Sequence, residues 1–120
     1  MALGFTQFPG SINLPRACMI VGLFTGAGAA NPTKVYGRQL TCTRQGVGVY
    51  RFTLSNKPSQ VPIVIAQTQG TAALMTTLAA WNVAGGYIDI TTQTDAGTDT
   101  ELSTAEKLSV IIIATDASSL

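Results

Sequence analysis

The sequence predicts an all-β fold, a small antiparallel β-sandwich or barrel of about seven strands that follows an extended N-terminal arm. Short apolar or alternating runs recur roughly every eight to twelve residues, and Gly, Pro, Asn and Asp separate them. The chain has 120 residues, which is enough for one folded domain and too few for two. We therefore expect an arm at residues 1–16 and a single β domain at residues 17–120.

The arm is predicted to be held by its own domain or by another chain. Pro9, Gly10 and Pro15 interrupt regular structure within it. A free tail has no need of large apolar side chains, yet the arm carries five, and these are the predicted interface residues: Leu3, Phe5, Phe8, Ile12 and Leu14.

The first predicted strand is the apolar run at residues 17–24, and a loop rich in Gly, Ala and Pro is expected at residues 25–37. The next two strands are expected to form a hairpin. Residues 38–44 and residues 47–54 both alternate, and a tight turn is predicted between them at residues 45–46. The side chains expected on the apolar faces of these strands are Leu40, Cys42, Tyr50, Phe52 and Leu54.

Three further segments continue the β pattern. Residues 61–68 form a β-branched run, and Pro62 places its start at a sheet edge because proline cannot donate to the ladder. Residues 71–81 fit a helix by their Ala, Leu and Met content and a strand by their alternation, and we favour the strand. Residues 87–94 alternate, with two isoleucines on one face.

The last segment leads from a turn at residues 95–97 to a final strand at residues 107–115. Between them, residues 98–106 are expected to form a polar loop or a single helical turn, with Ser103 and Glu106 spaced like a capping box. The final strand is almost continuously apolar. This pattern predicts burial on both faces, either in the centre of a sandwich or against another subunit.

Charge and histidine content argue against most enzyme classes. Only 11% of the residues are charged, against about 25% in a typical soluble domain. The chain contains no histidine, which is the commonest general base and metal ligand. We therefore predict no catalytic residue, no cofactor, no metal site and no small-molecule substrate, and expect a structural or binding role.

The net charge of +1 gives no basis for binding nucleic acid or an anionic membrane. The longest apolar runs, residues 17–24 and 108–114, are shorter than the roughly 20 residues that cross a bilayer. Arg16 and the first run imitate a signal peptide, but sixteen largely uncharged residues precede that run. We expect the chain to stay in the cytosol when it is made.

Two cysteines and three acidic residues have ordinary structural explanations. Cys18 and Cys42 allow one disulfide, but in a cytosolic protein we expect two small buried thiols. Asp95, Asp99 and Glu101 could surround Ca²⁺, but their spacing differs from the EF-hand loop, and a solvated turn is favoured.

Two larger sets of residues could form binding surfaces. Four aromatic residues could form a platform for carbohydrate, although packing in a core or interface is favoured for them: Tyr36, Tyr50, Trp81 and Tyr87. Three arginines could line up on adjacent strands as a small basic patch: Arg38, Arg44 and Arg51. We interpret such a patch as a solvated face or a contact with an acidic partner protein.

One family resemblance covers residues 38–115. It rests on the run Thr-Cys-Thr-Arg-Gln-Gly-Val-Gly-Val-Tyr-Arg-Phe-Thr-Leu at residues 41–54, on Gly-Tyr-Ile-Asp-Ile at residues 86–90, on Thr-Asp-Ala-Gly-Thr at residues 94–98, and on the closing apolar strand. These segments resemble small virion proteins of tailed bacteriophages, especially head decoration, or cement, proteins with compact β domains.

The resemblance implies a non-enzymatic protein, often a trimer, on the outside of an icosahedral head. Its partner would be the major capsid protein, whose neighbouring subunits it would tie together after assembly in the host cytoplasm. Residues 1–16 are then expected to anchor through Phe5, Phe8 and Leu14. The alternatives are another virion subunit, such as a tail or adaptor protein, and a carbohydrate-binding module.

Overall fold

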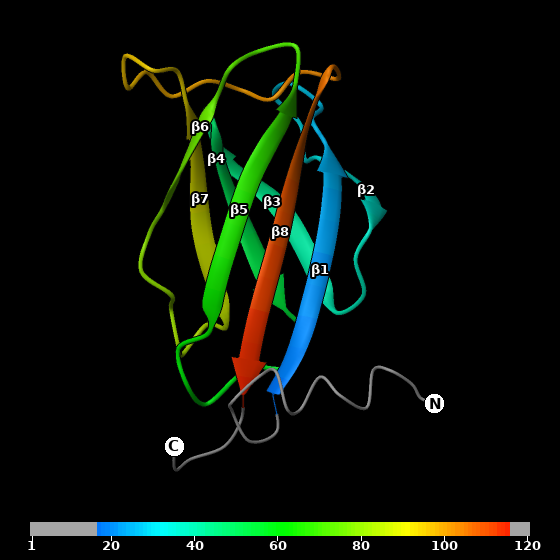
Figure 1. The fold of residues 1–120 in the computed structure, drawn as a ribbon, viewed down its shortest axis with the longest axis vertical. Coiled ribbons are helices and arrows are strands. Elements are labelled where there is room, and N and C mark those ends of the chain that lie inside the picture. Colours follow the sequence, from blue (N-terminus) through cyan, green and yellow to red (C-terminus); the bar gives the residue numbers. More distant parts are fainter. Residues whose placement is uncertain (1–16, 116–120) are drawn as a thin grey trace.

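Eight antiparallel strands form two four-stranded sheets that pack face to face (Figure 1). The structure is a computed structural model, and it describes residues 17–115. The strands are β1 (Ala17–Thr25), β2 (Thr33–Tyr36), β3 (Leu40–Gly46), β4 (Val49–Leu54), β5 (Ile63–Gly70), β6 (Met75–Leu78), β7 (Tyr87–Gln93) and β8 (Glu106–Thr115). The predicted all-β class is confirmed, and the described residues contain no helix, so none that could span a membrane.

The two sheets, which we call sheet A and sheet B, have strand orders β2-β1-β8-β5 and β3-β4-β7-β6. In sheet A, the first and last strands of the described chain pair along their whole length, from Ala17 opposite Thr115 to Thr25 opposite Lys107. Strand β5 pairs with the other side of β8. Figure 1 shows β1, β8 and β5 side by side in front of β3, β4 and β7.

The core lies between the sheets because every second side chain of the long strands points inward. In β4, the inward residues Tyr50, Phe52 and Leu54 are buried, as predicted. The rings of Phe24 and Phe52 meet edge to face across the core, with centroids 5.3 Å apart. Burial of these side chains supplies most of the driving force for packing the two sheets together.

Two details of the first half of the domain differ from the prediction. Strand β2 lies inside the predicted loop at residues 25–37, and all four of its residues are exposed, so no alternation of burial marks it in the sequence. The hairpin turn lies at residues 47–48 instead of 45–46. Gly48 has a φ of 68°, which favours glycine, and β3 continues to Gly46 through a shift in register after Arg44.

The second half follows the prediction more closely. Strand β5 lies at the edge of sheet A and begins directly after Pro62. Residues 75–78 form a strand, as favoured above. No helical turn forms at residues 98–106, but the carboxylate of Glu106 accepts hydrogen bonds from the backbone N–H and the hydroxyl of Ser103, so the capping-box pair closes a turn that leads into β8.

Candidate assembly surface

The two outer faces of the sandwich have different chemistry. The outer face of sheet B is polar: alternate positions of β3, β4 and β7 carry threonines together with the ion pair between Arg51 and Asp89. The corresponding positions of β1, β5 and β8 in sheet A carry mainly large apolar side chains. The outer face of sheet A is therefore the part of the described surface that water solvates least well.

Strand register gathers the apolar side chains of sheet A into two rows. Ile113 of β8 lies opposite Met19 of β1 on one side and opposite Ile63 of β5 on the other. Ile111 lies in the same way between Val21 and Ile65. We call these six residues the apolar face: Met19, Val21, Ile63, Ile65, Ile111 and Ile113.

The apolar face is open to solvent in the described chain. Met19, Ile63 and Ile65 are 50%, 53% and 55% exposed, and Val21 is 41% exposed. Ile111 and Ile113 are partly buried because the flanking strands shield them. Single exposed apolar residues are ordinary, but contiguous rows of them on one sheet face mark an interaction surface.

Burial of β8 on both faces was expected, and the sandwich provides it on one face alone. The even-numbered residues from Glu106 to Ala114 are buried against sheet B, whereas Ile111 and Ile113 point the other way. Among residues 17–115, no segment covers this outer side of β8. A central position within the sandwich therefore explains the burial of one face of this continuous apolar run and does not explain the apolar side chains on the other.

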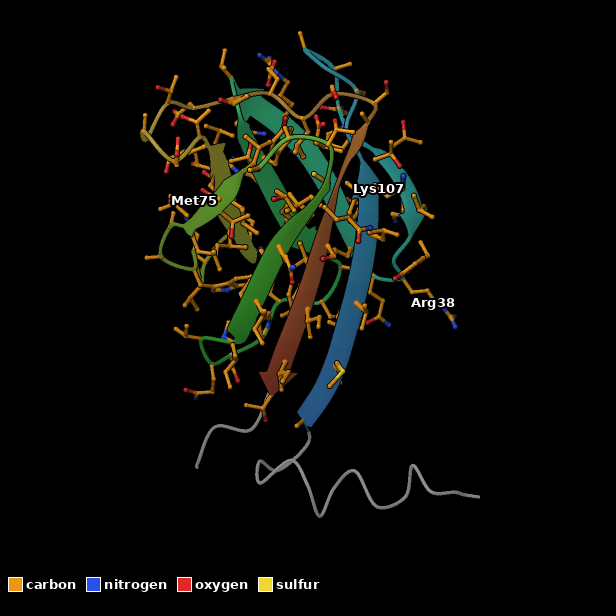
Figure 2. The ribbon with its side chains drawn as sticks, turned by 45° about the horizontal axis from the view of Figure 1, so that its top comes forward. Arg38, Met75 and Lys107 are labelled. Carbon is orange, nitrogen blue, oxygen red and sulfur yellow. The ribbon has the colours of Figure 1, made fainter. Side chains whose placement is uncertain are left out.

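The apolar face is nearly free of charge. Among the outward positions of β1, β5 and β8, Lys107 carries the one charge. Figure 2 shows Lys107 at the start of β8, at the end of the strand away from the apolar rows. Between it and those rows lie neutral polar side chains, Gln67 and Ser109. Desolvation of the apolar face therefore requires no charge to be buried.

The basic patch considered above does not form, because two of its three arginines are paired with carboxylates. Arg51 makes a two-pronged contact with Asp89, with N–O distances of 2.9 and 3.1 Å, and its guanidinium lies 3.9 Å from the centre of the Tyr87 ring. Arg44 pairs with Glu101 at 2.7 Å. Arg38 is exposed and points away from the sandwich (Figure 2).

The four aromatic residues considered as a carbohydrate platform are dispersed. Tyr50 and Trp81 are buried in the core. Tyr36 is exposed on β2 of sheet A, whereas Tyr87 lies on sheet B beneath Arg51. Packing in the core is confirmed for Tyr50 and Trp81, and the four residues share no aromatic surface.

The two cysteines are free, and the structure corrects the prediction for one of them. Cys42 is buried, and desolvation raises the pKa of its thiol to about 12, so it remains protonated. Cys18 is exposed, although it was expected in the core. It occupies an inward position of β1, but lies at the open end of the sandwich, where the opposite sheet does not cover it.

The acidic residues at 95, 99 and 101 do not converge. Glu101 turns inward to Arg44, Asp99 accepts a hydrogen bond from Gln93, and Asp95 is exposed. Within residues 17–115, no group of three or more His, Cys, Asp or Glu side chains is placed to hold a metal ion.

A pocket of about 340 Å³ occupies the open end of the sandwich near Cys18 and Thr115. Its other lining residues are Ile20, Gln39, Leu54, Asn56, Lys57, Pro58 and Ala114. Among residues 17–115, the titratable side chains of this lining are the amine of Lys57 and the thiol of Cys18.

The predicted interface residues Leu3, Phe5, Phe8, Ile12 and Leu14 lie outside the described residues. The apolar face was not predicted from the sequence. Its signal was present in three runs that are apolar at consecutive positions, residues 19–21, 63–65 and 110–113, where an isolated sandwich would alternate. Comparison of the chain with protein-family models, curated proteins and solved structures found no significant match.

Proposed function

We propose that this protein is a non-enzymatic structural subunit, a decoration protein that binds the outer surface of a tailed-phage head and clamps neighbouring major capsid subunits. The observation that carries the structural, assembly-forming part of the proposal is the apolar face of sheet A, which no segment within residues 17–115 covers. The resemblance over residues 38–115 supplies the class of assembly.

The physical properties of the sandwich suit a protein that is built into a shell. Its ladders and two partly buried ion pairs make a rigid domain. Its few charges keep the cost of desolvation low when a surface is covered. A standard stable interface buries about 1,600 Å² in total, and many identical contacts on one shell add avidity.

The arm supports the same role. Residues 1–16 lead directly into Ala17, two positions before the apolar face begins at Met19. An extended segment with five large apolar side chains can add a strand to an exposed sheet edge or lie in a groove of a partner. In the proposal, the arm contacts the capsid protein and the sandwich contributes further contacts between subunits.

Deletion of residues 2–15 tests the arm. We expect co-sedimentation with phage heads to weaken at least about tenfold, because loss of large buried anchors removes most of an interface's binding energy. A variant with Phe5→Ser and Phe8→Ser keeps the arm's length and should weaken binding in the same direction. Unchanged binding by both variants would remove the arm from the mechanism.

The full chain tests the assembly itself. Imaging of decorated heads should give a copy number that matches the capsid lattice, since each copy bridges lattice neighbours. A few copies per particle would indicate a tail or adaptor subunit. Absence of the protein from virions would overturn the proposal.

A further inference from the structure

We infer that the apolar face is a contact between two copies of this chain, which pack sheet A against sheet A across a two-fold axis. The inference rests on the proposed role as an assembly subunit and names the partner of one of its surfaces. A second copy is the occupant that the shape, charge and area of this face fit.

The shape of the apolar face allows it to pack against itself. Its two rows come from three adjacent strands, and most of its side chains are β-branched, so they form ridges on a sheet. Two such sheets stack about 10 Å apart, with strands crossing at about 30°, and side chains of each fill the gaps of the other. Strand β2 leaves this approach open, because it pairs with β1 only from Leu23 to Thr25.

The charge distribution favours a like partner. A two-fold axis between Ile111 and Ile113 would place the two copies of Lys107 at opposite ends, roughly 30 Å apart. The centre of the contact would be wholly apolar, and Gln67 and Ser109 would contribute a neutral rim, as is typical of protein interfaces. A partner with a charged surface would find no complementary charge on the apolar face.

The flat area of the apolar sheet face is about half of what each partner buries in a stable dimer, before the projecting side chains are counted. The three long strands β1, β8 and β5, about 4.8 Å apart and eight to ten residues long, give sheet A a flat outer area of about 430 Å² in each copy. A standard interface buries about 800 Å² per partner. The side chains that project from the sheet, together with Val35 and Tyr36 of the exposed strand β2, can supply the difference.

A two-fold contact of this kind closes on itself, because each copy presents the same surface. It gives a dimer and leaves no second copy of the apolar face exposed. The trimer implied by the family resemblance would need a different contact, between two unlike surfaces of the chain.

Analytical ultracentrifugation of the purified full chain tests the inference. We expect the molar mass of the wild type in solution to be twice the 12.5 kDa mass of one chain. Ile65→Lys places a charge on the apolar face and should raise the dimer dissociation constant at least about 100-fold, because two lysines would face each other near the axis. Thr41→Lys is the matched control, since Thr41 is exposed on the outer face of the other sheet's edge strand, and it should leave the dimer intact.

A second variant separates loss of contact from loss of folding. Ile65→Thr keeps a β-branched side chain suited to a strand and should also weaken the dimer, with an unchanged circular-dichroism spectrum. A monomeric or trimeric wild type, or a folded Ile65→Lys variant that remains dimeric, would overturn the inference. Head binding by a monomeric wild type would leave the proposed function standing, whereas a dimer that binds no heads would refute that function alone.

Discussion

Glu101 shows how single contacts hold the described domain together. Its carboxylate pairs with the guanidinium of Arg44 at 2.7 Å and accepts a hydrogen bond of 2.9 Å from the backbone N–H of Gly48. The hydroxyl of Tyr50 lies 3.5 Å away. Arg44, followed by the Gly48 hydrogen bond, holds the pKa of Glu101 below its ordinary value of 4.5. One side chain thus ties the loop after β7 to the hairpin of β3 and β4.

Glu101→Gln should lower the free energy of unfolding by about 1–2 kcal/mol, because the neutral amide loses the ion pair and the charge-assisted bond. Urea denaturation measures the change. Asp99→Asn is the control: Asp99 is exposed, and its carboxylate accepts a hydrogen bond from the side-chain amide of Gln93 at the surface, so the effect on the free energy of unfolding should be within about 0.5 kcal/mol. Equal effects of both substitutions would contradict the role assigned to Glu101.

At the scale of single residues, the sequence indicated which side chains are buried, but it did not indicate which residues they contact. Arg44 and Glu101 are 57 residues apart, so no local pattern connects them. The expectation that Cys42 is buried came from alternation and is confirmed. The same reasoning was wrong for Cys18, because alternation indicates the side of a sheet and says nothing of how far the opposite sheet extends.

At the scale of elements, side-chain hydrogen bonds close the sandwich between the edge strands β5 and β6. The hydroxyl of Thr68 donates to the carbonyl of Leu74 at 2.7 Å, and the hydroxyl of Thr76 donates to the carbonyl of Ala66 at 3.0 Å. These bonds link sheet A to sheet B. They also occupy backbone carbonyls near an edge that would otherwise be open to strand pairing.

Thr68→Val should lower the free energy of unfolding by about 1 kcal/mol, because it keeps the shape of the side chain and leaves the Leu74 carbonyl without this donor. Thermal or urea unfolding measures the loss. Thr77→Val is the matched control, since Thr77 bonds only to an exposed glutamine side chain at the surface. A Thr68→Val protein as stable as the control would show that this bond does not hold the sheets together.

Long, strictly alternating elements could be predicted from the sequence, and short ones could not. Strands β4 and β7 alternate over their full length, and both were predicted with the correct buried face. Strand β2 has four exposed residues and exists only because it pairs with the end of β1. Its stability depends on tertiary contact, which local propensity does not report.

At the scale of the whole molecule, the all-β class followed from composition and periodicity, but the apolar face did not. The face arises only when β1, β8 and β5 are placed side by side, which brings Ile113 between Met19 and Ile63. Those three strands are far apart in the sequence. Their apolar excess was visible, but the fact that it falls on one outer surface depends on strand order.

The pH dependence of stability is also a property of the whole molecule, because no histidine titrates near neutrality. Stability should be flat from about pH 5 to about pH 8. Ser103 lowers the pKa of Glu106, and Arg44 lowers that of Glu101, both from 4.5, so the unfolded chain binds more protons in acid. This stabilisation is fully present above pH 4.5 and is lost as the pH falls through the folded-state pKa values.

The alkaline limb has the opposite sign and a different origin. Burial raises the pKa of Cys42 from 9.0 to about 12, so the unfolded chain releases this proton first. Its contribution is therefore fully present below about pH 9 and declines as the pH rises toward about 12.

Urea midpoints measured across the pH range should show both limbs. Glu101→Gln should make the acid limb shallower, since Glu106 still contributes to it, and should leave the alkaline limb unchanged. Cys42→Val should make the alkaline limb shallower and leave the acid limb unchanged. A Cys42→Val protein with an unchanged alkaline limb would contradict this assignment and leave Tyr50, whose pKa burial also raises, as the group responsible.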